Sequence, residues 1–445
     1  MAPRRPDKKS KKRAAALSRA AAGGSSPASD PSPSASASSS SSSRQITPLV
    51  LVRAAEAQLQ EGNAEAAAAL AQNALDQAQA QALTATGSDD DATLAALNFL
   101  GQVHLELGDL DAARSYYLRA AALDPEGARD EAVGGGAEKF LCLAQLSEEG
   151  GRDSVAWFEK GAVALRARIQ SLESNKTTKP NTTLSKLQRQ RNHEDEAEAE
   201  TEELKRKLAM ALCSVAEVYM TDLSWEADAE QRCEALVTEA TLVAPASAEA
   251  WQTLADVRIS QARPEDARAA LARSLDVWKG LEPDHRDVPA FPSRVALARL
   301  LMEVGMEREA LEVLERLVAE DDGSVQTWYL GGWGLFVLGE KLREREKVKG
   351  KSGEGKQQQS KAEDDEDDDW NTSWISSRVW LNQCLHLYKL QEYEDEPLGE
   401  HAKELLAAIV KELGEAPADG EGDDDDDEGE DGWEDAGDSD EEMQE

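Results

Sequence analysis

Aromatic residues are scarce in this chain of 445 residues, and no segment alternates β-branched and polar residues with a period of two. Tryptophan, tyrosine and phenylalanine together make up only 5% of the sequence. Because sheets are built from alternating segments rich in such residues, a β-sheet core is excluded. Alanine dominates the middle of the chain instead, and this composition predicts an all-α fold.

The sequence also lacks any apolar run of about eighteen residues, and its basic N-terminus leads into a serine-rich stretch without the apolar core of a signal peptide. We therefore expect no membrane partner and a location in the cytoplasm and nucleus. The four cysteines have no CxxC spacing. They are expected to be small buried residues in a reducing compartment, with a metal or redox site as the alternative: Cys142, Cys213, Cys233 and Cys384.

Basic residues are strongly outnumbered, and the formal net charge is −39. Residues 1–45 carry about +7 and residues 414–445 about −18, so the chain between them is itself strongly acidic, at about −28. Such a surface repels polyanions and attracts cations, and salt weakens both effects. Direct nucleic-acid binding is therefore disfavoured, and a basic protein is the favoured partner.

Both ends of the chain are predicted to be disordered, because neither can bury apolar surface. Residues 1–45 form a basic and then Ser-rich segment, and residues 414–445 form an acidic tail. The basic cluster fits a nuclear localisation signal, which makes a nuclear import receptor a second expected partner; a merely solubilising arm is the alternative. The cluster consists of Arg4, Arg5, Lys8, Lys9, Lys11, Lys12 and Arg13.

A repeat of about 34 residues begins near residue 46, and its clearest copy runs from Leu94 to Gly127. In this copy Gly101 and Ala113 are small where two helices would cross, Gly108 lies at the turn between them, and Pro125 ends the second helix. These positions resemble the tetratricopeptide (TPR) repeat. The resemblance implies a right-handed superhelical solenoid in which the first helix of each pair lines the concave surface.

Applied along the chain, the same spacing predicts about seven helix pairs over residues 46–413, the last followed by a capping helix from about residue 397 to 413. Insertions are expected at about 172–203, as an exposed loop or a lengthened helix, and at 343–372, as an exposed loop. Gly134 to Gly136 are expected to be a linker. A capped and highly charged solenoid predicts a monomer.

The sequence offers no catalytic arrangement. The five histidines are scattered without metal-ligand spacing, and His104 occupies an aromatic packing position within a repeat. Gly134 to Gly136 follow no strand and lack the Lys-Ser/Thr continuation of a phosphate-binding loop. We therefore predict a protein that is not an enzyme, with no cofactor, no metal and no catalytic residue.

The repeats offer a concave binding surface instead. Its predicted side chains are mostly acidic or amide, which suits Lys and Arg side chains and an extended backbone. A heat-shock-chaperone clamp would need Lys or Arg here, and the sequence departs from that pattern. The predicted client-binding residues are Glu56, Asn98, Gln102, Glu106, Glu217, Asp222, Gln252, Asp256, Glu303 and Trp328.

Two strings go beyond a generic repeat: Glu217 to Leu223, continuing with Asp228 to Leu236, and Leu254 to Gln261. Together with the basic N-terminus and the acidic tail, they resemble the fungal assembly chaperones of large-subunit ribosomal protein 4. This resemblance implies a dedicated chaperone that shields the long internal loop of the ribosomal protein and escorts it to nuclear pre-ribosomes. A histone-type acidic chaperone and a non-catalytic scaffold subunit are the alternatives.

Overall fold

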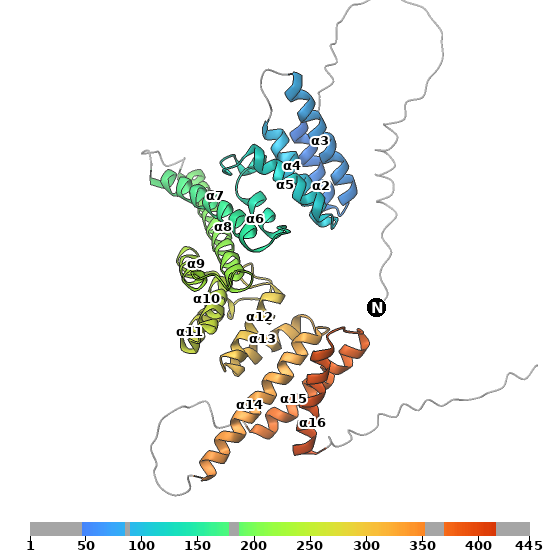
Figure 1. Cartoon of the computed structure of the whole chain (residues 1–445), viewed down its shortest axis with the longest axis vertical. Coiled ribbons are helices and arrows are strands. Elements are labelled where there is room, and N and C mark those ends of the chain that lie inside the picture. The colour runs from blue at the N-terminus through green and yellow to red at the C-terminus, as the bar shows by residue number, and fades with distance from the viewer. Residues whose placement is uncertain (1–46, 85–89, 178–186, 352–368, 415–445) are drawn as a thin grey trace, which may run out of the picture. The chain divides into compact units, whose positions relative to one another are not determined.

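The computed structural model of the protein describes residues 47–84, 90–177, 187–351 and 369–414, and within them it contains helices and no strand (Figure 1). The all-α prediction is therefore confirmed for the described residues. The basic cluster and the tail beyond residue 414 lie outside those ranges, so the expectations about them stay predictions. The α-helices are α2 (Pro48–Gln60), α3 (Ala64–Thr84), α4 (Asp90–Glu106), α5 (Leu110–Leu123), α6 (Glu138–Gln145), α7 (Gly151–Thr177), α8 (Leu187–Met220), α9 (Ala229–Val243), α10 (Ala248–Ser260), α11 (Pro264–Trp278), α12 (Phe291–Glu303), α13 (Glu307–Glu320), α14 (Val325–Lys351), α15 (Trp370–Leu390) and α16 (Glu396–Leu413), and a 3-10 turn, η2, spans Glu131–Val133.

The helices pack in sequence order, and α2/α3 to α14/α15 form the seven predicted pairs. The predicted capping helix is α16, which packs on α15 and α14. First helices of neighbouring pairs also touch one another: α8 contacts α10, α10 contacts α12, and α12 contacts α14. Side chains on the outer faces of α8, α10 and α12 can therefore form a continuous surface.

The second pair shows why the repeat spacing produces this packing. A Cβ on Gly101 would lie 2.7 Å from the ring of Tyr117, so only glycine lets α4 and α5 approach this closely. Gly108 has φ +76° at the turn, and Asp109 caps α5 by accepting a hydrogen bond from the backbone N–H of Ala112 at 3.1 Å. The close helix approach and the turn thus lie at the positions that the repeat predicted, and Asp109 adds a cap to α5.

The described parts of the two insertions form helix rather than loop. α7 continues to Thr177 and α8 begins at Leu187, so the described part of 172–203 lengthens two neighbouring helices. α14 likewise continues to Lys351, which makes the loop interpretation of residues 343–351 wrong. Alanine, glutamate, lysine and arginine are strong helix formers, and an already formed helix extends at low cost through such a run. None of the described helices is long and apolar enough to cross a bilayer.

The last pair depends on another close approach between helices. A Cβ on Gly331 of α14 would overlap the indole ring of Trp380 on α15. Overpacking of this kind costs about 1–3 kcal/mol, and the higher helix propensity of alanine offsets at most about 1 kcal/mol. We therefore expect Gly331→Ala to lower the free energy of unfolding by about 1–2 kcal/mol in urea titrations.

Gly280→Ala is the matched control for that substitution. Gly280 follows α11, and no atom lies within 4 Å of the position that its Cβ would take. Its effect should stay within about 0.5 kcal/mol. Equal losses from the two variants would mean that the contact between α14 and α15 is not the cause.

Candidate functional site

Three of the predicted binding residues form one group, which we call the acidic row: Glu217, Asp256 and Glu303. They lie on α8, α10 and α12, the first helices of three successive pairs. Partial burial raises the pKa of Glu217, and the negative charge of Asp256 raises it further. Partial burial also raises the pKa of Asp256, and Glu303 adds to this shift. The negative charge of each carboxylate therefore raises the pKa of the one before it in the row.

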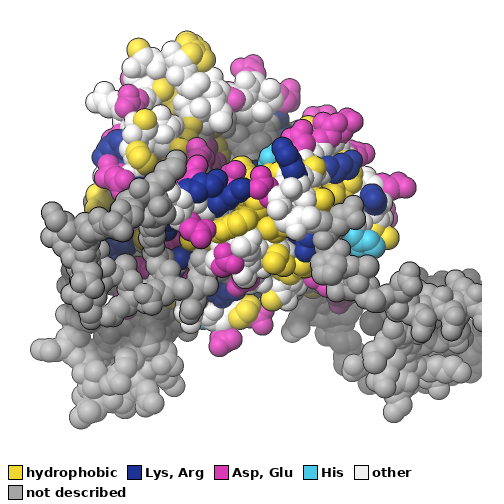
Figure 2. Space-filling model, turned by 90° about the horizontal axis from the view of Figure 1, so that it is seen from below, with side chains coloured by type: hydrophobic (Ala, Val, Ile, Leu, Met, Phe, Trp, Pro, Cys, Tyr) yellow, Lys and Arg dark blue, Asp and Glu magenta, His cyan; other side chains and the backbone are white. Residues whose placement is uncertain are grey.

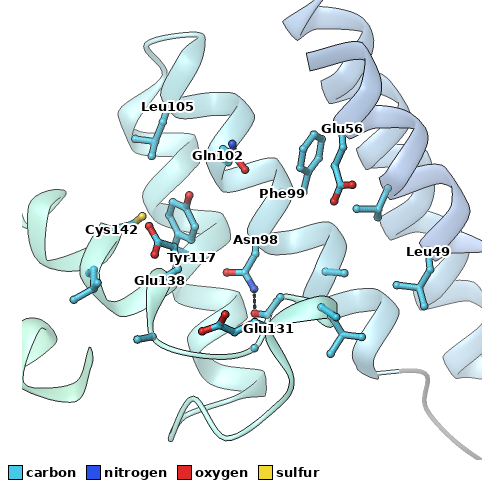
Figure 3. Close-up of a pocket in the computed structure, with 18 of the residues that line it drawn as sticks. Leu49, Glu56, Asn98, Phe99, Gln102, Leu105, Tyr117, Glu131, Glu138 and Cys142 are labelled. Atoms are coloured by element: carbon cyan, nitrogen blue, oxygen red, sulfur yellow. Dashed lines mark hydrogen bonds between the residues drawn. The ribbon is translucent and has the colours of Figure 1, made fainter. Parts of the chain in front are cut away.

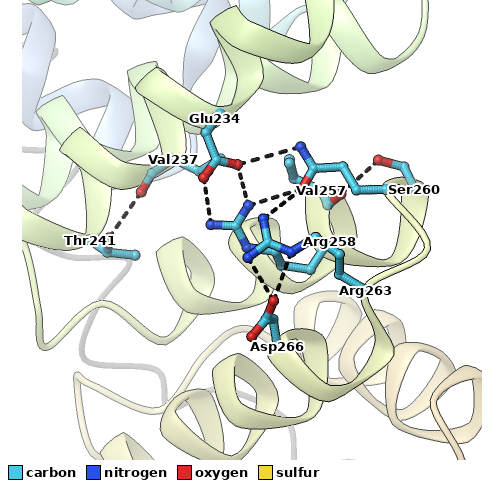
Figure 4. Close-up of polar contacts among 9 residues, drawn as sticks. Glu234, Val237, Thr241, Val257, Arg258, Ser260, Arg263 and Asp266 are labelled. Carbon is cyan, nitrogen blue, oxygen red and sulfur yellow. Dashed lines mark hydrogen bonds and ion pairs between the residues drawn. The ribbon is translucent and has the colours of Figure 1, made fainter.

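The acidic row has no counterion of its own. Among the described residues, none of its three carboxylates forms an ion pair with a lysine or an arginine. A carboxylate on the neighbouring helix α9 differs: Arg258 of α10 pairs with Glu234 and holds the pKa of this glutamate below its usual value (Figure 4). Repulsion inside the row is therefore uncompensated, and a cationic partner would relieve it.

This repulsion predicts that the stability of the folded state depends on pH. A carboxyl whose pKa is raised in the folded state binds more protons folded than unfolded, so stability falls as pH rises from the ordinary pKa through the raised one. We expect Asp256→Asn to raise the free energy of unfolding at pH 7 by about 0.5 kcal/mol, the upper range for surface substitutions.

The gain should shrink as pH is lowered toward 4, because the raised pKa lets the native carboxyl take up a proton over this range. Urea titrations at the two pH values would check this difference. A loss of stability at pH 7 would contradict the claim that the row is under electrostatic strain.

A groove adjoins the first helix pairs, and it holds three further predicted residues: Glu56, Asn98 and Gln102. We call it the N-terminal groove, and it has a cavity volume of about 670 Å³. Figure 3 shows its side chains projecting into the space between α2, α4 and α6. Its apolar lining includes Leu49, Phe99, Leu105, Tyr117 and Leu141.

One wall of the groove is the expected linker, the segment between α5 and α6, which hydrogen bonds hold in place. Asn98 donates hydrogen bonds from its amide to the carbonyls of Gly134, at 2.5 Å, and Leu94, at 3.1 Å (Figure 3). Gly134 and Gly136 have φ of +77° and +79°, which other residues rarely adopt. The Asn98 amide thus holds the protein's own backbone at the edge of the groove, and its predicted client contact stays a prediction.

A buried ion pair supports the same segment. The Lys139 ammonium lies 2.8 Å from Oδ2 of Asp124 and donates another hydrogen bond to the carbonyl of Gly136 at 2.7 Å. The other oxygen of Asp124 accepts a hydrogen bond from the backbone N–H of Ala128 at 3.0 Å. Both side chains are at least 96% buried, so the pair fixes the start and the end of the segment.

The remaining predicted residues do not join the row. Asp222 lies in the turn after α8, where its carboxylate accepts a hydrogen bond from the backbone N–H of Gly151 at 3.0 Å. Trp328 packs against Trp380 with ring centroids 4.7 Å apart and the rings tilted by 58°, and its indole N–H donates to the carbonyl of Asp322. Both side chains thus make contacts within the chain, although Asp222 is exposed and Trp328 half-buried, and their predicted client contacts stay predictions. Glu106 is exposed at the end of α4 and Gln252 half-buried on α10.

Sequence reasoning missed several residues near these surfaces. Glu249 lies close enough to Cys213 to raise its pKa, as Glu217 also does, although burial is the main cause of that shift to about 12. Its spacing of seven residues from Asp256 on α10 could have revealed it. Glu131 and Glu138 of the groove carried no such signal, because they lie in or directly after an irregular segment.

The described cysteines are packing residues rather than metal ligands. No group of three His, Cys, Asp or Glu side chains among them could hold a metal ion. Burial raises the pKa of Cys142 to about 11, so this thiol is not a reactive thiolate at neutral pH. Cys213, Cys233 and Cys384 are buried and Cys142 half-buried, as expected for packing residues, and His104 stacks on Tyr116.

The surface is a mosaic rather than a uniformly acidic field. On the face shown in Figure 2, Asp and Glu side chains are spread over the described surface, with Lys and Arg side chains between them and apolar side chains near the middle. Many of these charges form exposed ion pairs, such as Arg166 with Glu239 and Arg168 with Glu200. Carboxylates without a counterion are therefore more informative than the net charge.

Comparisons with known proteins agree with the repeat and with the family resemblance. The tetratricopeptide repeat family matches residues 94–126. A protein of Emericella nidulans named "Probable assembly chaperone of rpl4" is 45% identical over 362 residues, which cover 80% of this chain and 82% of the relative. A Schizosaccharomyces pombe protein of the same name is 34% identical over 252 residues, 56% of this chain and 66% of its own. The solved structure named "Assembly Chaperone of RpL4" has 53% identity and a TM-score of 0.60, and the match covers 68% of this chain and all of that one.

Proposed function

The chain belongs to the family of assembly chaperones of large-subunit ribosomal protein 4, and we propose that it holds this ribosomal protein on the acidic row. The observation that carries the proposal is the row itself: Glu217, Asp256 and Glu303 face one another without a counterion. Lysine and arginine side chains of a client would supply the missing positive charge. The fold needs no catalytic step for this role.

A chaperone of this kind is useful because ribosomal proteins carry Lys- and Arg-rich extensions that have no folded partner until they reach ribosomal RNA. Such an extension binds stray polyanions or aggregates unless its charge is neutralised. A fixed surface of unpaired carboxylates neutralises it reversibly, since the attraction weakens with salt and with competing polyanions. We propose the extended internal loop of the ribosomal protein as the segment bound, and competition by ribosomal RNA as the release step.

Nuclear escort is a further part of the proposal. The basic cluster between Arg4 and Arg13 would recruit a nuclear import receptor, so that the complex passes from the cytoplasm to nuclear pre-ribosomes. Removing these basic residues should leave client binding intact and change only where the protein is found. Loss of client binding in the same variant would instead give the cluster a different role.

The first experiment is affinity purification of the tagged protein from cytosol at moderate salt, with mass spectrometry of the proteins that co-elute in stoichiometric amounts. Large-subunit ribosomal protein 4 should dominate, without the rest of the ribosome, and raising the salt should release it. Histones as the dominant partner would favour a histone-type chaperone. A large complex stable at high salt would favour a scaffold subunit and overturn the proposal.

A further inference from the structure

We propose that the N-terminal groove is an apolar anchor site, which takes a bulky apolar side chain from the same extended client segment whose basic residues lie on the acidic row. The inference rests on the proposed function and deepens it. It divides the binding surface into two parts with different chemistry, an apolar pocket and a row of carboxylates. It also predicts how far apart the two kinds of client residue lie.

The size and lining of the groove fit an apolar side chain. Its volume of about 670 Å³ is within the range of about 300–1,000 Å³ that is typical of ligand pockets. Leu49, Leu105 and Leu141 are only half-buried, so they present apolar surface that the described residues leave uncovered. Phe99 and Tyr117 are almost fully buried and form a rigid floor beneath them. A rigid apolar floor with open leucines is suited to a partner side chain.

The charges around the groove differ from those of the row. Three carboxylates line it, but so do Arg53 and Lys207, and Lys207 lies 3.8 Å from Glu138. The groove is therefore close to charge balance, whereas no described lysine or arginine forms an ion pair with the row. Electrostatic attraction of a client lysine or arginine is therefore weak at the groove and strong at the row. The groove thus favours the apolar residue of the segment.

Helix α8 connects the two parts. Lys207 lines the groove, and Lys207, Met210, Ser214 and Glu217 follow one another at spacings of three and four residues, so they share one face of α8. Met210 is 54% exposed on this face and continues the apolar surface toward the row. Ten residues of α-helix rise about 15 Å, which an extended chain spans in about four to five residues.

The occupant is therefore one extended segment of the basic client, with a bulky apolar side chain about four to five residues from a lysine or arginine. Charge complementarity with the row and the continuous face of α8 both point to this occupant. A substitution that fills the groove tests this occupant. Gln102 is exposed within the groove and makes no hydrogen bond among the described residues, so Gln102→Trp should fill the groove without removing a charge.

The test measures the dissociation constant of the full chain for purified large-subunit ribosomal protein 4 over a series of NaCl concentrations. Gln102→Trp should weaken binding about tenfold at every salt concentration, since burial of one large apolar side chain is insensitive to salt. The slope against salt should stay unchanged. Gln60→Trp, at the exposed end of α2 and outside the groove, is the matched control and should bind normally.

Three outcomes separate the two proposals. Normal binding by Gln102→Trp, with salt-sensitive binding by the unmodified protein, overturns the anchor site and leaves the proposed function standing. No binding of the ribosomal protein to the unmodified chain overturns both. A synthetic peptide with a tryptophan five residues from a Lys-Arg pair should bind about tenfold more tightly than its Trp→Ser version, and equal affinities would also overturn the anchor site.

Discussion

Lys139→Met is expected to lower the free energy of unfolding by about 3–5 kcal/mol, the largest loss of stability that we predict for a single substitution. The substitution leaves the Asp124 carboxylate 96% buried without its cation. Burial lowers the pKa of Lys139, and the nearby Asp124 opposes that shift, so the pair is stable only while both charges are present. Urea titration at neutral pH measures the loss.

A double variant tests whether the buried charge is the cause. Lys139→Met combined with Asp124→Leu removes both charges, and it should recover most of the stability, since apolar replacements of a buried ion pair are often neutral or stabilising. Arg166→Met breaks an exposed ion pair with Glu239 and should cost at most about 1 kcal/mol. A double variant as unstable as Lys139→Met would show that the packing volume of the lysine matters more than its charge.

The same pair explains why part of the site could not be predicted. Asp124 and Lys139 are 15 residues apart and come from opposite ends of the segment between α5 and α6, so no local pattern links them. Three consecutive glycines predicted a linker but not its contacts, and a Cβ on Gly134 would lie only 2.9 Å from the amide nitrogen of Asn98. Long-range contacts of this kind decide the shape of the N-terminal groove, and the sequence does not reveal them.

The helical repeat was predictable because its determinants are local. Gly101, Gly108 and Ala113 lie within 13 residues, and each acts through the helix crossing or the turn next to it. The acidic row was predictable for the same reason, since a residue's face on an amphipathic first helix follows from spacing alone. Spacing could not reveal that Trp328 turns toward Trp380, because that contact joins α14 to a helix beyond the second insertion.

The acidic row also lowers the stability of the folded protein. Burial and a neighbouring carboxylate raise the pKa of Glu217 and of Asp256, and raised values of this kind lower the stability of the folded state at neutral pH. Perturbed groups of this kind mark functional sites more often than structural ones. We therefore attribute the row to the proposed binding role rather than to folding.

Reversing the row should have the largest effect on client binding. Glu217→Lys, Asp256→Lys and Glu303→Lys together are expected to weaken binding of large-subunit ribosomal protein 4 about a thousandfold, on the basis of about 1.4 kcal/mol for each carboxylate. The variant should also lose most of its salt dependence, because the lysines would repel the residues that the carboxylates attract. Thermal unfolding checks that the helices still form.

The net charge itself changes by six units in this variant, so a control must change it equally at another place. Glu230→Lys on α9 with Glu312→Lys and Glu315→Lys on α13 meets this condition, since all three glutamates are exposed on second helices and outside the row. If the row recognises the client by contact, the control should keep its equilibrium affinity within a few-fold and lose mainly association rate. If the control weakens binding as much as the row variant does, the long-range field of the whole chain binds the client, and the first helices have no special part in it.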